Sequence, residues 1–117
     1  MPDSNFSLNL LAGSVSFRFP LEAAIALRDE ISALLENLKA TSVRPGQPGK
    51  PDPKPPTEYR HTGDVFLEIF CNPNIWPSPF AAKVLVTLRD ERIRLTTEAE
   101  LTQLISDLND FIAQNSA

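Results

Sequence analysis

The stretch that decides the fold is VLVTLRDERIRLTTEAELTQLISDLNDFI, residues 84–112. It begins as a strand, turns at Asp90-Glu91, and continues as a second strand through Leu95. Thr97 and Glu100 have the spacing of a capping box, in which a hydroxyl and a carboxylate pair with backbone N–H groups at a helix start. Apolar residues then recur every three or four positions: Leu101, Leu104, Ile105, Leu108, Phe111 and Ile112. We therefore predict two strands and a helix whose apolar stripe packs on the sheet.

The N-terminal part of the chain has a similar order of elements. Residues 6–10 and 15–19 alternate in polarity around a turn at 12–14, which predicts a β-hairpin. Pro20 fits the first position of a helix ending near Lys39, where a missing N–H costs nothing. The apolar stripe of this helix precedes that of the second helix by 77 positions, and the strand residues match at an offset of 76. The sequence thus predicts an approximate duplication of a strand-strand-helix unit.

Residues 41–60 differ in composition from both halves. They hold six of the eleven prolines together with Gly46 and Gly49. Such a segment favours a solvated, extended backbone and buries little apolar surface. We predict a proline-rich flexible linker that joins halves 1–40 and 61–117.

A third strand is predicted at residues 65–70, followed by a proline-rich loop at 72–80. The whole chain, residues 1–117, is then a single α+β domain with an antiparallel sheet of about five strands and two helices on one face. The residues expected to point towards the helices are Val65, Leu67, Ile69, Val84, Val86, Leu88, Ile93 and Leu95.

Composition narrows the classes of function. The net charge is −4 over 117 residues, which argues against binding a phosphate backbone as the main task. One cysteine cannot form an internal disulfide, and no apolar run is long enough for a membrane span. The first residues lack the basic start and apolar run of a signal peptide. We expect a cytoplasmic protein.

The sequence offers few residues for catalysis. His61 and Cys71 flank a single predicted strand, which would hold them about 30 Å apart and prevent a nucleophile pair. No second His or Cys is present to complete a metal cluster, and the glycines do not form a phosphate-binding loop. Asp90 and Glu91 lie at a hairpin tip in water. We expect no catalytic residue, no metal and no cofactor.

The face of the sheet turned away from the helices is the first candidate contact surface. It is expected to show Phe66, Glu68, Phe70, Leu85, Thr87, Arg92 and Arg94, with Arg18 from the first hairpin. A partly apolar face of this kind is typical of a protein interface. Aromatic rings among arginines also fit single-stranded nucleic acid, although Glu68 and the acidic total argue against it. An ordinary solvated face is the third interpretation.

The loop at 72–80 is the second candidate surface. Trp76, with Ile75 and Phe80, has the apolar area of an anchor for a partner, and prolines reduce the entropy that such a loop loses on binding. The alternative is that these side chains fold back and close one end of the core.

These observations lead to a non-enzymatic protein-binding or regulatory module, with a second copy of the chain as one candidate partner. Its expected contact residues are Trp76, Ile75, Phe80, Phe66, Phe70, Arg92 and Arg94. One alternative is a protein that binds single-stranded nucleic acid. Another is a small-ligand protein or enzyme with a pocket under the Trp76 loop.

Overall fold

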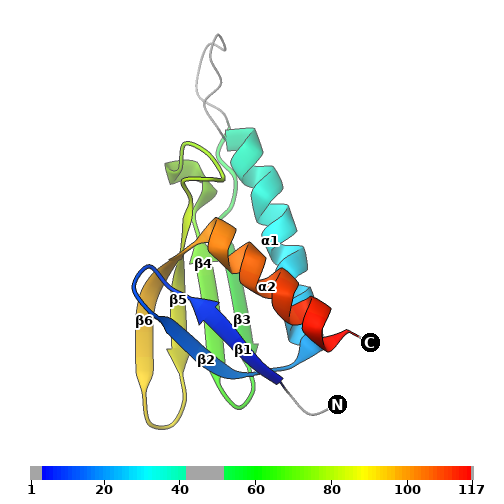
Figure 1. Cartoon of the computed structure of the whole chain (residues 1–117). Helices are drawn as coiled ribbons and strands as arrows, with labels where there is room; N and C mark the ends of the chain where they lie inside the picture. The colour runs from blue at the N-terminus through cyan, green and yellow to red at the C-terminus, as the bar shows by residue number, and fades with distance from the viewer. Residues whose placement is uncertain (1–3, 42–51, 117) are drawn as a thin grey trace.

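The computed structural model describes residues 4–41 and 52–116 and has the α+β fold that the sequence predicts (Figure 1). Its elements in order are β1 (Ser4–Asn9), β2 (Ser14–Phe19), α1 (Leu21–Thr41), β3 (Thr57–Thr62), β4 (Phe66–Cys71), the 3-10 turn η1 (Pro73–Ile75), β5 (Lys83–Arg89), β6 (Arg94–Glu100) and α2 (Leu101–Asn115). A hairpin followed directly by a helix occurs twice, as β1-β2-α1 and as β5-β6-α2. This is the duplicated unit that the sequence predicts.

The larger sheet has the order β3-β4-β5-β6, and all neighbouring strands are antiparallel. One of its faces is buried and carries Tyr59, Leu67, Ile69, Cys71, Val84, Val86, Leu88 and Ala99. The Tyr59 hydroxyl donates a hydrogen bond of 3.1 Å to the Ala23 carbonyl of α1, so α1 lies on this face. Figure 1 shows α2 crossing in front of the same sheet. Both helices therefore cover one face, as predicted.

The first hairpin does not join this sheet. β1 and β2 pair only with each other, so the prediction of one sheet with about five strands is corrected to sheets of two and four strands. The hairpin lies with α2 over the covered face, and the Leu11 N–H at its tip donates to the Glu98 carbonyl of β6 at 3.3 Å. Alternation shows which side of a strand is buried, but it does not identify the strand's neighbours.

Aromatic rings hold the hairpin in place. The Phe6 ring lies 5.5 Å from Phe17, 5.6 Å from Phe19 and 5.2 Å from Phe111 of α2, measured between ring centroids. Phe19 also meets the His61 ring of β3 edge-on at 5.2 Å. Such pairs each contribute about 1 kcal/mol beyond the area they bury. The core is thus formed jointly by the hairpin, both helices and one face of the larger sheet.

The C-terminal end of the predicted linker is wrong. Residues 57–60 belong to β3, which pairs with β4 along its whole length. Pro55 and Pro56 lie just before the first residue of this strand, so their missing N–H groups remove no hydrogen bond from it. Thr57 and Tyr59 are buried between exposed Glu58 and Arg60, the alternation of a half-buried strand. Residues 42–51 lie outside the described residues.

The predicted capping box is also wrong. Thr97 and Glu100 belong to β6, and α2 begins at Leu101 with no side-chain cap at Glu100. The strand continues because β5 pairs with β6 as far as Lys83 opposite Glu100. Leu101 N–H then donates to the Ala82 carbonyl at 3.0 Å. The ladder gives these backbone groups partners that a local cap would otherwise supply.

Candidate functional site

The two residues that could form a nucleophile pair are not together. β3 and β4 form a hairpin in which Cys71 lies opposite Thr57, four positions from His61. Strand geometry then separates His61 and Cys71 by about 13 Å, so the predicted 30 Å is wrong, although the distance is still too long for the pair. Burial raises the pKa of the Cys71 thiol to about 11, which a hydrogen bond from Trp76 partly offsets. The thiol is therefore protonated near neutral pH.

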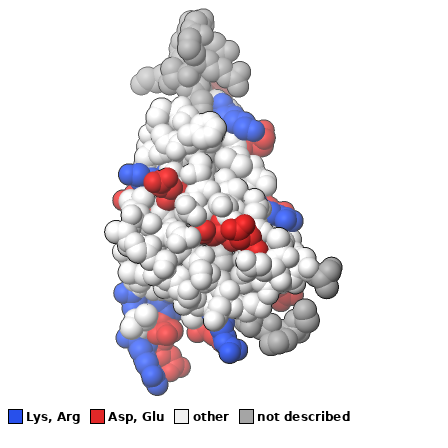
Figure 2. All heavy atoms as spheres, in the orientation of Figure 1, with Lys and Arg blue, Asp and Glu red and all other residues white. Residues whose placement is uncertain are grey.

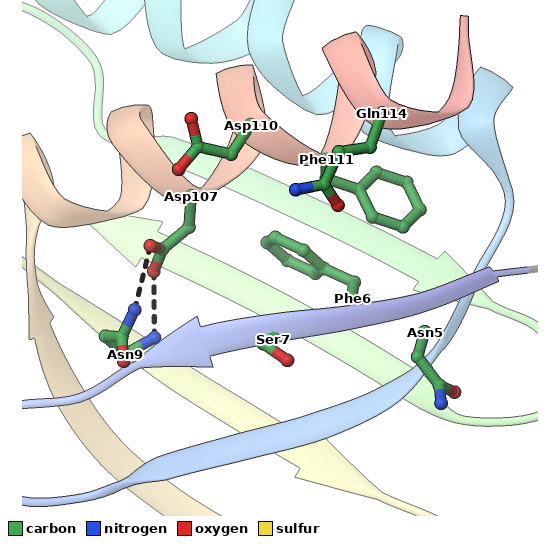
Figure 3. Close-up of a pocket in the computed structure, with 8 residues that line it drawn as sticks. All are labelled: Asn5, Phe6, Ser7, Asn9, Asp107, Asp110, Phe111 and Gln114. Carbon is green, nitrogen blue, oxygen red and sulfur yellow. Dashed lines mark hydrogen bonds between the residues drawn. The ribbon is translucent and has the colours of Figure 1, made fainter.

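The acidic residues also gather in no metal-binding arrangement within the described parts of the chain. A polar cavity of about 240 Å³ lies between β1 and α2, beside Asn9, Asp107 and Asp110 (Figure 3). The buried Asp107 carboxylate accepts hydrogen bonds from the Asn9 backbone, the Asn9 side chain and the Gln103 side chain. Its oxygens are thus occupied in joining hairpin to helix.

The Trp76 loop divides its apolar residues between core and solvent. Asn72 caps η1 by accepting from the Asn74 N–H, and the Thr41 hydroxyl at the end of α1 donates to the Pro73 carbonyl at 2.9 Å. Trp76 is partly buried and packs against the core. Ile75 and Phe80, in contrast, are 66% and 85% exposed. Trp76 therefore helps to close the core, while Ile75 and Phe80 remain available for contact.

The second cavity is a groove of about 150 Å³ between α1 and α2, lined in part by Ile31, Leu35 and Ile105. Neither this groove nor the polar cavity includes a residue of the Trp76 loop.

The open face of the larger sheet, opposite the helices, brings together most of the residues predicted for this face: Phe66, Glu68, Phe70, Leu85, Thr87 and Arg94. Strand register places its side chains in three rows across β3, β4, β5 and β6. The first row is Thr62, Phe66, Arg89 and Arg94. The second row is Arg60, Glu68, Thr87 and Thr96. The third row is Glu58, Phe70, Leu85 and Glu98.

The centre of the open face is apolar and partly exposed. Leu85 is 42% exposed and lies directly opposite the half-buried Phe70, while Phe66 is half-buried in the first row. The Arg89 guanidinium lies 4.3 Å from the centre of the Phe66 ring, a cation–π contact that covers part of this ring. Thr87 is buried between its neighbours. The described helices and first hairpin all lie on the other face, so they leave this centre in contact with solvent.

Charge is distributed unevenly over the open face. The first row carries two arginines and the third row two glutamates. In the second row Arg60 forms an ion pair with Glu68, and it also lies 3.9 Å from Glu58. Because Arg60 is exposed, these pairs add little to stability, but they fix the orientation of the side chains. Beyond the third row Lys83 lies opposite Glu100 on the same face, so the open face has a positive end and an end whose net charge is negative.

Two expected members of the surface, and one residue expected in the core, lie elsewhere. Arg18 belongs to β2 and is exposed on the first hairpin, so it is not part of the open face. Arg92 lies in the turn at the border of the first row, where the Asp90 carboxylate accepts from its N–H. Ile93 was expected in the core but is 61% exposed, because it closes this turn by accepting from the Asp90 N–H.

Sequence reasoning missed the charges that β3 and β5 add to the open face: Glu58, Arg60 and Arg89. The buried–exposed alternation of TEYRHT, residues 57–62, is the signal that could have identified the first two. Figure 2 shows the opposite side of the molecule, where charged side chains lie mainly near the margins and one acidic group lies near the centre.

Among the described residues no helix has the length and apolar character that crossing a membrane requires. Comparisons with protein-family models, curated proteins and solved structures give no match, so the role of the open face has to be argued from its own geometry.

Proposed function

We propose that this protein is a non-enzymatic protein-binding module, acting in the cytoplasm, whose contact surface is the open face. The observation that carries the proposal is the partly exposed apolar centre formed by Phe66, Phe70 and Leu85 with charged residues around it. An apolar centre within a polar rim is the usual anatomy of a protein interface. Burying the exposed parts of these three side chains would contribute on the order of 1 kcal/mol each.

The Trp76 loop extends this surface. β4 and β5 both run into the loop at the end of the sheet that carries the third row. Ile75 and Phe80 are exposed there, beyond the third row. These two side chains are the part of the loop that remains open to a partner.

Nucleic acid is the competing partner, and charge argues against it. Arg89, Arg92 and Arg94 lie near the first row, but Glu58 and Glu98 occupy the third row. Arg60 is already paired with Glu68 and Glu58. A phosphate backbone crossing the open face would meet these glutamates, and the chain as a whole carries −4. A protein partner, in contrast, can place acidic groups over the arginines of the first row and basic groups over the glutamates of the third row.

The experiment compares proteins captured from extract of the cells that make the protein, using wild type, Leu85→Arg and Ser16→Arg as baits. Leu85 lies on the open face, whereas Ser16 is exposed on the first hairpin and serves as a matched control. We expect a reproducible set of captured proteins with wild type and Ser16→Arg and loss of that set with Leu85→Arg. Recovery of the same set with all three baits would contradict the proposal. Circular dichroism confirms that each bait is folded.

A further inference from the structure

We infer that the open face binds a second copy of this chain, face to face, through a two-fold axis that crosses the strands along the second row. This inference rests on the proposed binding role of the open face and identifies its partner. Charged residues alternate along β6 and the turn before it. The residues at alternate positions from 92 to 100 are Arg92, Arg94, Thr96, Glu98 and Glu100. Their charges change sign about Thr96.

A two-fold axis of this kind turns that pattern into complementarity. It places each strand over the same strand of the second copy with its direction reversed, so the first row of one copy lies over the third row of the other. Arg94 then lies over Glu98 of the second copy, and Phe66 lies over its Phe70. Both contacts occur twice in the dimer. The second row meets itself, and its Arg60 and Glu68 are already ion-paired within each copy.

The charges also select this axis over the other two-fold axis that lies in the interface. An axis parallel to the strands would keep each row over itself and reverse the strand order, so Glu58 of one copy would lie over Glu98 of the other, twice in the dimer. Arg94 would lie over Thr62 and Arg89 over Phe66, with no carboxylate over either arginine. Like charges in contact at an interface oppose association by several kcal/mol. Only the axis along the second row places the positive end of one copy over the negative end of the other.

Arg94 and Glu98 form none of the ion pairs found among the described residues of one copy, although Lys83, opposite Glu100, lies diagonal to Glu98 on the same face. The ion pairs formed by the described residues are Lys39–Glu36, Arg60–Glu58 and Arg60–Glu68. Arg94 lies directly opposite Arg89 on the neighbouring strand, an arrangement of like charges that destabilises a sheet. A second copy would place a carboxylate over this arginine. Packed sheets cross at about 30°, which shifts such a pair by about 5 Å and keeps it within reach of these long side chains.

Pairing of two β6 edges would align the same charges, but the first hairpin obstructs it. Leu11 N–H donates to the Glu98 carbonyl, so the hairpin tip occupies the place of an added strand beside Glu98. Edge pairing would also leave Phe70 and Leu85 in solvent. Face-to-face packing buries both residues and leaves the hairpin tip undisturbed.

The size of the open face predicts a weak dimer. Four strands about 4.8 Å apart and about 23 Å long give roughly 440 Å² per copy. The total, about 900 Å², is below the range of stable complexes and in the range of transient ones. The association must therefore be measured from micromolar to millimolar protein.

The test uses sedimentation equilibrium of the purified full chain with two charge reversals, Arg94→Glu and Glu98→Arg. Each variant alone places like charges in both contacts, and we expect its association to be weaker by about tenfold or more. In the heterodimer of an equimolar mixture the acidic side chain at position 94 of one variant faces the basic side chain at position 98 of the other, and the second contact is the native Arg94–Glu98 pair. We expect the mixture to regain the wild-type association. Arg28→Glu, an exposed reversal on α1, is the control and should associate as wild type does.

Several outcomes overturn the inference. These are a wild-type chain that stays monomeric up to about 1 mM, single reversals that associate like wild type, or a mixture that remains monomeric. Leu85→Ser should weaken the dimer, and unchanged association of this variant would indicate edge pairing instead. If the chain stays monomeric but captures other proteins, and Leu85→Arg abolishes this capture, the inferred self-association is wrong while the proposed protein-binding function is supported. Binding of a labelled single-stranded oligonucleotide that is lost with Arg94→Glu, by a monomeric chain, would overturn both.

Discussion

Asp107 on α2 accepts two hydrogen bonds from Asn9 on β1, 98 positions earlier in the chain: one from the backbone N–H at 2.8 Å and one from the side-chain amide at 2.9 Å (Figure 3). The carboxylate is only 7% exposed, and Gln103 supplies a third donor at 2.9 Å. These bonds join the first hairpin to the last helix beside the contact of Phe6 with Phe111. Asp107 therefore attaches the hairpin to α2 by hydrogen bonds, as the aromatic cluster does by ring contacts.

Replacing Asp107 with alanine should lower the free energy of unfolding by about 2–3 kcal/mol, because three donors lose a charged acceptor in a partly buried place. Urea denaturation measures this loss. Asp110→Ala is the matched control, since Asp110 lies one turn away beside the same cavity but is exposed, and it should change stability by less than about 0.5 kcal/mol. Equal losses in the two variants would mean that the hydrogen bonds to Asn9 contribute nothing.

Trp76 and Phe80 should behave oppositely although both are large aromatic residues of one loop. Trp76→Ala should cost about 2 kcal/mol, because it opens a space against the core, whereas Phe80→Ala should cost less than about 0.5 kcal/mol. The Cys71 thiol, 1% exposed and hydrogen-bonded to Trp76, should react faster with a thiol reagent in Trp76→Ala. If Phe80→Ala speeds this reaction as much, Trp76 does not cover the thiol.

Stability should fall between about pH 9 and pH 12. Burial, with a smaller contribution from Glu30, raises the pKa of Tyr59 to about 12, and burial raises the pKa of Cys71 to about 11. Both groups are neutral when protonated, so each stabilises the fold fully below its unfolded pKa and loses that contribution as pH rises towards the folded value. The loss should be at most about 3 kcal/mol for each group. Urea denaturation at a series of alkaline pH values should show a shallower decline above pH 10 for Tyr59→Phe, and an unchanged decline would contradict the assignment to Tyr59.

Gly13 is a position where only backbone conformation should matter. Its φ is +92°, and no atom lies within 4 Å of the place a Cβ would take. Gly13→Ala should therefore destabilise the protein by about 1 kcal/mol through strain alone. Gly13→Asn should lose less, because asparagine tolerates positive φ better. Thermal unfolding compares the two variants, and equal melting temperatures for Gly13→Ala and wild type would mean that the turn relaxes without cost.

Helical periodicity was the most reliable guide from sequence to structure. The predicted stripe of α2 is buried except at Ile105, which is partly buried, because a helix with one covered side has little freedom in where its apolar residues lie. Strand alternation placed Phe66, Phe70 and Leu85 on the side away from the helices for the same reason. Local pattern therefore predicted which side of each element is covered.

The remaining differences come from partners distant in the sequence. Thr97 and Glu100 look like a helix start until β5 is known to extend beside them. The sequence pattern does not predict β3, because Pro55 and Pro56 precede the strand and its exposed positions are polar. Without β3, the ion pair of Arg60 with Glu68 and the negative end of the open face could not be predicted.

The contact between β1 and α2 constrains how the molecule can be made. During synthesis the first hairpin leaves the ribosome before α2 does. The contacts of Phe6 and Phe19 with Phe111 therefore cannot form until about 100 more residues have been translated. Until then the nascent hairpin presents an apolar side with nothing to cover it. Contacts of such long sequence separation slow folding and prolong the period in which a chaperone can bind or chains can aggregate. The junction that completes the core therefore cannot form before α2 has been synthesised.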